Sequence, residues 1–135
     1  MTSLHTILVA TDLSAPSRHA SMRAALLAQA SGARLELLHV LQGSALDQLS
    51  QVVGAQAEAV LSRLMGEVRD KLRQLAADIG EPLGVSTGVH LTTGSVLQAI
   101  SAQADLMDPD LLVLGARGTG FMGRSSVARG HPLFS

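Results

Sequence analysis

Short apolar runs alternate with helix-forming segments along most of this 135-residue chain. Three runs lie at residues 6–10, 34–40 and 111–114, and at residues 85–91 Val85, Thr87, Val89 and Leu91 alternate with polar or small residues. Runs of this kind predict strands, and the fully apolar last run predicts a central one. Strands that alternate with helices imply right-handed crossovers and an open parallel sheet with helices on both faces. The alternation therefore predicts an α/β, doubly wound fold with four strands.

Three helices are predicted between these strands. The first spans residues 14–31, from a serine N-cap to the glycine that follows the helix. The second is indicated by apolar residues at steps of three or four between residues 46 and 79, and Gly54 leaves open whether the first part is a loop or a short helix. The third lies between Ser95 and Pro109.

Composition excludes several classes of protein. With 47% hydrophobic and 16% charged residues the chain is too apolar to be disordered, and its length suits one domain over residues 1–135. The net charge is −1 and the cations are scattered, so the sequence shows no basic patch for binding nucleic acid or an anionic membrane. Aromatic residues make up only 1% of the chain, which argues against binding that depends on stacking bases on aromatic side chains. Cysteine is absent, which suits a reducing compartment, and no apolar run could span a membrane. We therefore expect a cytoplasmic domain.

Candidate binding residues follow the strands. In open parallel sheets, ligands bind beyond the carboxyl ends of the strands, where the strand order reverses. These ends are Asp12, Val40 and Gly115. Residues 115–120 read G-A-R-G-T-G, and glycines let backbone N–H groups approach a phosphate closely. Neither a Walker A motif nor a Rossmann fingerprint is present, so a phosphate cradle and a flexible strand exit are both open interpretations.

Three segments together resemble the universal stress protein family. They are I-L-V-A-T-D-L-S at residues 7–14, L-L-H-V at 37–40 and L-L-V-L-G-A-R-G at 111–118. The resemblance implies a cytoplasmic protein with a five-stranded parallel sheet, frequent dimerisation and, in one branch of the family, bound ATP.

The resemblance also implies roles for residues at the strand ends. Asp12 would lie near the adenosine, Val40 would give adenine an apolar wall, and Gly115 and Gly118 would cradle the phosphates. Arg117 would add positive charge at the same oxygens, and Mg²⁺ would accompany a triphosphate. The implied cofactor-binding set is Thr11, Asp12, Val40, Gly115, Arg117, Gly118, Ser125 and Ser126.

The chain departs from the family pattern near its C-terminus. The signature of the ATP-binding branch is G-x-x-G, nine residues, then G followed by Ser or Thr; its last two positions fall on Ala128 and Arg129, and Ser125 and Ser126 are the available substitutes. The tail at residues 130–135 holds no apolar strand. We therefore expect the fifth strand to be missing and the edge of the last strand to be exposed, as in a divergent or C-terminally truncated member.

Two functions are predicted. The first is a stress-response protein that binds ATP or another adenine nucleotide; the alternative is a signalling or interaction module that binds no nucleotide and acts through dimerisation. A homo-oligomer is expected in both cases.

No nucleophile and base, or metal ligands, stand at a recognisable spacing, so we expect no enzyme, with slow ATP hydrolysis left open. His39 is interpreted as a satisfied core or rim residue, and Asp105, Asp108 and Asp110 as a solvated turn.

Overall fold

The computed structural model describes residues 4–42, 47, 51, 56–115 and 125–129. Every predicted strand and helix in these ranges is present. The elements are β1 (Thr6–Thr11), α1 (Ala15–Ser31), β2 (Arg34–Gln42), α3 (Ala57–Gly80), the short 3₁₀ helix η2 (Glu81–Leu83), β3 (Thr87–Gly94), α4 (Val96–Met107), β4 (Leu111–Gly115) and β5 (Ser125–Arg129).

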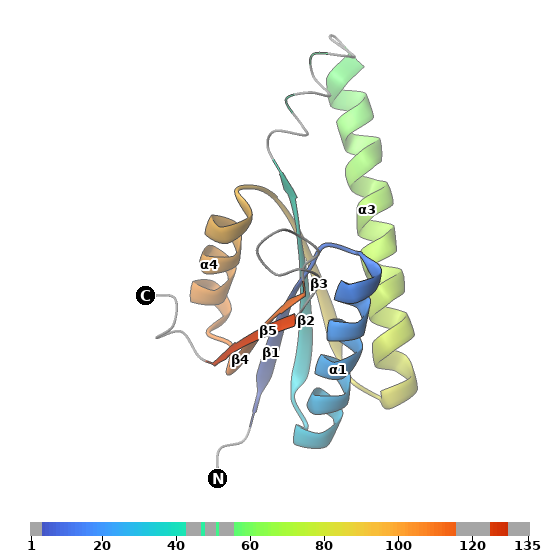
Figure 1. Cartoon of the computed structure of the whole chain (residues 1–135). Coiled ribbons are helices and arrows are strands. Elements are labelled where there is room, and N and C mark those ends of the chain that lie inside the picture. The colour runs from blue at the N-terminus through green and yellow to red at the C-terminus, as the bar shows by residue number, and fades with distance from the viewer. Residues whose placement is uncertain (1–3, 43–46, 48–50, 52–55, 116–124, 130–135) are drawn as a thin grey trace.

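The strands form one sheet in the order β3-β2-β1-β4-β5. The pairs β1 with β2, β1 with β4 and β2 with β3 are all parallel, and Val9 of β1 lies between Leu37 and Val113. Helices α1 and α3 cover one face of this sheet and α4 covers the other (Figure 1). The predicted doubly wound α/β fold is confirmed.

The core has one layer on each face of the sheet. Successive strand residues point to opposite faces, so a continuous apolar run supplies both layers. Ile7, Val9 and Leu37 pack under α1 and α3, whereas Leu8 and Leu112 pack under α4. Helix α1 buries small side chains, which bring it close to the strands: Ala20, Ala24, Ala25 and Ala28.

The ends of the helices follow the predicted signals. The Ser14 side chain accepts a hydrogen bond from the Ser17 N–H at 3.3 Å, and Gly32 ends α1 in the left-handed conformation with φ +76°. Helix α3 begins after Gly54, and its last three turns bury Leu72, Leu75 and Ile79. The earlier part of the predicted apolar stripe, residues 46–53, lies almost entirely outside the described residues.

The expectation of a missing fifth strand is wrong. Strand β5 pairs antiparallel with β4, from Gly115 opposite Ser125 to Leu111 opposite Arg129, and so covers the edge that was expected to be exposed. A parallel strand needs a crossover of a dozen or more residues, and only residues 116–124 separate β4 from β5, so the chain returns antiparallel. The sequence S-S-V-A-R lacks an apolar run, which is why the hydrophobic pattern did not predict a strand there. An edge strand can form without such a run, because it requires backbone pairing on one side only.

Candidate functional site

A pocket of about 180 Å³ opens at the carboxyl ends of β1, β2 and β4, on the face covered by α4. Its floor comes from the strands and its wall from the first turns of α4. The apolar lining residues are Ala10, Leu38, Val40, Val96, Leu97, Ile100 and Leu114. Polar groups line it where the strands end, at Thr11, Asp12, His39 and Gln42. The pocket thus has an apolar interior and a polar rim.

Four of the predicted site residues meet at this pocket. Thr11, Asp12, Val40 and Gly115 all line it, because the carboxyl ends of parallel strands lie at one edge of the sheet. In the register of β1 and β4, Thr11 is opposite Gly115. The strand order reverses at β1, which has β2 on one side and β4 on the other. The pocket therefore occupies the position where this class of sheet binds ligands.

The remaining predicted residues follow β4 in the sequence. Arg117 and Gly118 fall outside the described residues. Ser125 and Ser126 begin β5, where the backbone of Ser125 pairs with Gly115 at the pocket edge. Ala128 and Arg129, at the signature positions that the sequence does not match, pair with Leu112 and Leu111 at the opposite end of β4.

The turn after β1 is held by hydroxyl groups. The Oγ1 of buried Thr11 lies 2.5 Å from the Oγ of Ser17, and it accepts a hydrogen bond from the Leu13 N–H at 3.0 Å. The Asp12 Oδ1 accepts from the Ser14 N–H at 2.9 Å. Leu13 takes a left-handed conformation, with φ +64°, which a leucine rarely adopts. The hydrogen bonds on both sides of Leu13 explain how this turn is maintained.

Close packing of α1 on β4 leaves little room for a side chain at position 115. A Cβ there would lie 3.0 Å from the Ser17 Oγ, 3.1 Å from the Ala20 Cβ and 3.2 Å from the Ser17 Cα. Gly115 therefore allows Ser17, whose side chain contacts the turn after β1, to lie close against the end of β4. The glycine predicted for phosphate approach also has this packing role.

His39 has a hydrogen-bond partner, as the sequence interpretation predicted, and it also lines the candidate pocket. Its Nδ1 lies 2.7 Å from the Thr11 carbonyl oxygen, and the residue is half-buried and lines the pocket. The sequence also missed Gln42, Leu114 and the lining residues of α4. The apolar positions of α4 are visible in the sequence, but which of them reach the strand ends depends on how the helix docks.

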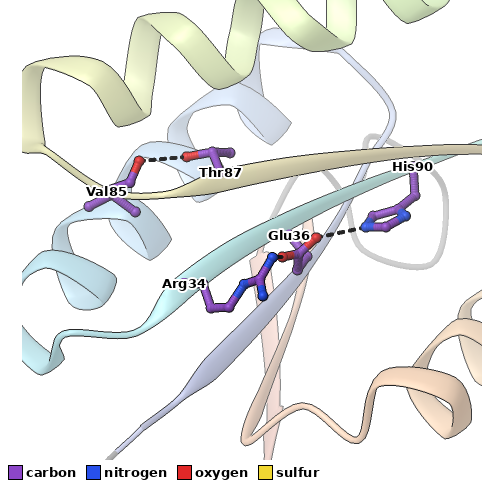
Figure 2. Close-up of polar contacts among 5 residues, drawn as sticks. All are labelled: Arg34, Glu36, Val85, Thr87 and His90. Atoms are coloured by element: carbon purple, nitrogen blue, oxygen red, sulfur yellow. Dashed lines mark hydrogen bonds and ion pairs between the residues drawn. The ribbon is translucent and has the colours of Figure 1, made fainter.

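A second polar cluster lies on β2 and β3 (Figure 2). The buried Glu36 carboxylate accepts from Arg34 at 2.9 Å through one oxygen and contacts the His90 Nε2 at 2.7 Å through the other. Gly88 lies opposite Glu36 in the register, and a Cβ there would collide with the Glu36 Oε1. Since both carboxylate oxygens are occupied by protein groups, this cluster joins the two strands.

No group of three or more His, Cys, Asp or Glu residues in the described ranges is placed to hold a metal ion. No helix within the same ranges has the length and apolar character to cross a membrane.

Comparisons with known proteins agree on one family. The sequence profile of the Universal stress protein family matches residues 3–130. The structure of universal stress protein UspA from Lactobacillus plantarum is similar, with 26% identity, a TM-score of 0.63 and coverage of 92% of this chain and 85% of that chain. No curated protein matches the sequence.

Two further solved structures share the fold at lower identity. The hypothetical protein MJ0577 has a TM-score of 0.71 and 18% identity, over 88% of this chain and 79% of that chain. A universal stress protein in complex with cAMP has a TM-score of 0.58 and 23% identity, over 82% of this chain and 71% of that chain.

Proposed function

Because the chain belongs to the universal stress protein family, we propose that it binds ATP or another adenine nucleotide in the pocket at the ends of β1, β2 and β4. The observation that carries the proposal is the meeting of Thr11, Asp12, Val40 and Gly115 at one apolar pocket. The pocket lies where the strand order reverses, the usual ligand position in such sheets. The cAMP complex of a protein with this fold supports an adenine nucleotide as the class of ligand.

The pocket suits the base better than the whole nucleotide. Its volume of about 180 Å³ is below the 300–1,000 Å³ of a typical small-molecule site. Adenine would lie against Val40 and α4 without aromatic stacking, and Asp12 would bind the ribose side. The phosphates would then extend past Gly115 toward the glycine-rich segment, and Mg²⁺ would accompany a triphosphate.

We propose nucleotide-dependent signalling rather than dedicated catalysis, in a homo-oligomer within the cytoplasm. Within the described pocket lining there is no nucleophile paired with a base: the nearby hydroxyls of Thr11 and Ser17 contact each other, and His39 bonds a backbone carbonyl. The cytoplasmic assignment is supported by the absence of cysteine, which suits a reducing compartment.

Two exposed leucines on α4 give a matched test. Leu97 is 71% exposed and lines the pocket, whereas Leu106 is 80% exposed and lies at the other end of the same helix, outside the pocket lining. We expect Leu97→Asp to weaken ATP binding roughly tenfold, about 1.4 kcal/mol, since it replaces part of the apolar wall against adenine with a charged group. Leu106→Asp should leave the affinity unchanged. Isothermal titration calorimetry with ATP and Mg²⁺ measures both.

The titration also decides between the two predicted functions. Saturable binding that Leu97→Asp weakens and Leu106→Asp does not supports the nucleotide site. A wild-type protein that shows no saturable binding at millimolar ATP overturns the proposal and favours an interaction module of the same fold. Equal effects of the two substitutions would place the nucleotide outside this pocket.

A further inference from the structure

The peptide group between Thr11 and Asp12 is held at both ends by side chains from other elements. Its carbonyl oxygen, on Thr11, lies 2.7 Å from the Nδ1 of His39 on β2. Its N–H, on Asp12, donates to the Oγ of Ser17 on α1 at 3.2 Å. Three elements therefore meet at the one peptide that precedes the Asp12 side chain.

The contact with Thr11 determines where the His39 proton lies. A carbonyl oxygen can only accept a hydrogen bond, so the Nδ1 of His39 must carry the hydrogen. In the neutral imidazole, Nε2 is then left without a proton. The ring orientation and the tautomer are both set by a backbone atom of the neighbouring strand.

Fixing this peptide also fixes the direction of the Asp12 side chain. Rotation of the peptide plane would break the His39 and Ser17 hydrogen bonds together and turn the Cα of Asp12. The Asp12 Oδ1 accepts from the Ser14 N–H at 2.9 Å, which fixes the carboxylate from its other end. A preorganised carboxylate binds a ligand with less loss of conformational freedom.

We propose that His39 is a positioning residue that holds Asp12 in the orientation needed for nucleotide binding. This rests on the proposed function, because Asp12 is assigned there to the ribose side of the pocket. His39 acts through the Thr11 carbonyl. Its substitution therefore alters affinity only as far as Asp12 contributes to affinity.

The first test uses the free protein and is independent of any nucleotide. Nitrogen-15 NMR in mildly alkaline buffer reports which ring nitrogen of His39 carries the proton. We expect the Nδ1–H tautomer, and we expect the Asp12 amide resonance to shift in His39→Leu. The Nε2–H tautomer, or an Asp12 amide that His39→Leu does not move, overturns the proposal whether or not ATP binds.

The second test is a double-mutant cycle on ATP affinity. His39→Leu removes the donor and should weaken ATP binding roughly fivefold, the effect of about one hydrogen bond. His39→Asn keeps an N–H donor near the position of Nδ1 and should bind within about twofold of wild type. In an Asp12→Ala background, His39→Leu should have no further effect, because the residue through which it acts is gone.

The cycle distinguishes failure of the positioning role of His39 from failure of the proposed nucleotide binding. Equal weakening by His39→Leu in both backgrounds would show that His39 acts on the ligand or the fold directly, and it would overturn the positioning role. An unchanged affinity in His39→Leu would do the same. If wild type binds no ATP, the proposed function fails, and the NMR experiment alone decides whether His39 orients Asp12.

Discussion

At the scale of single residues, Asp110 connects the start of β1 to the start of β4. Its Oδ2 accepts hydrogen bonds from the N–H groups of His5 at 2.7 Å and Thr6 at 3.0 Å, and its own N–H donates to the Thr6 carbonyl at 2.9 Å. The sequence interpretation, a solvated turn, missed this role. The hydrogen bond from His5, followed by that from Thr6, lowers the pKa of the Asp110 carboxyl below its ordinary value of 3.8.

A lowered pKa makes the contribution of Asp110 depend on pH. The charged form is favoured in the folded state, so its contribution to stability is complete above pH 3.8 and is lost as the pH falls through the folded-state pKa. We expect Asp110→Asn to lower the free energy of unfolding by roughly 1 kcal/mol at neutral pH. Urea denaturation at several pH values should show the two proteins converge in strong acid. Asp105→Asn, at an exposed position of α4, should match wild type at every pH.

At the scale of elements, the pairing of β2 with β3 depends on a glycine opposite a buried carboxylate. Glu36 is only 4% exposed and is paired with Gly88 in the strand register. Its carboxylate lies between Arg34 and His90 (Figure 2). A buried charge is tolerated where its oxygens are bonded, and it becomes costly when a partner is displaced. A side chain at position 88 would displace the Glu36 carboxylate from these contacts.

Two glycine substitutions should therefore change stability in opposite directions. Gly88→Ala places a methyl group against the Glu36 Oε1 and should destabilise the protein by roughly 1–3 kcal/mol. Gly66 lies inside α3, and a Cβ there meets nothing within 4 Å. Gly66→Ala should stabilise the protein by roughly 0.5–1 kcal/mol, because alanine loses less backbone freedom in a helix. Urea denaturation measures both. A Gly88→Ala protein as stable as wild type would contradict the role of this cluster.

At the scale of the whole molecule, β5 covers one edge of the sheet. Five residue pairs, from Gly115 with Ser125 to Leu111 with Arg129, join it to β4. An uncovered strand edge presents free N–H and C=O groups to a second chain. We therefore expect β5 to increase the stability of the domain and to limit its association with a second chain through β4.

Shortening the chain tests this role of β5. A chain ending at residue 124 should lose roughly 2 kcal/mol, since each backbone hydrogen bond contributes about 0.5–1.5 kcal/mol. It should also associate more strongly with rising concentration, measured by sedimentation velocity beside wild type. A chain ending at residue 129 keeps β5 and is the control. Equal stability and association in the two shortened chains would show that β5 does not protect the edge.

Much of the candidate site was predictable because it follows from local pattern and one rule of sheet architecture. Thr11, Asp12, Val40 and Gly115 each end a strand that the sequence identifies, and the strand ends of a parallel sheet meet. The individual α4 residues that form the pocket wall could not be predicted from the sequence. Leu97 lines the pocket and Leu106 does not, although both are exposed leucines of one helix.

The sequence by itself determined the order of the first four strands and the helices between them, the caps at Ser14 and Gly32, and the parallel α/β architecture. These depend on periodicity and capping over a few residues, which are local properties of the chain. Only the tertiary structure decided that β5 returns antiparallel and that His39 reaches the Thr11 carbonyl from 28 positions along the chain. Such contacts depend on register and helix docking, which arise when distant segments pack together.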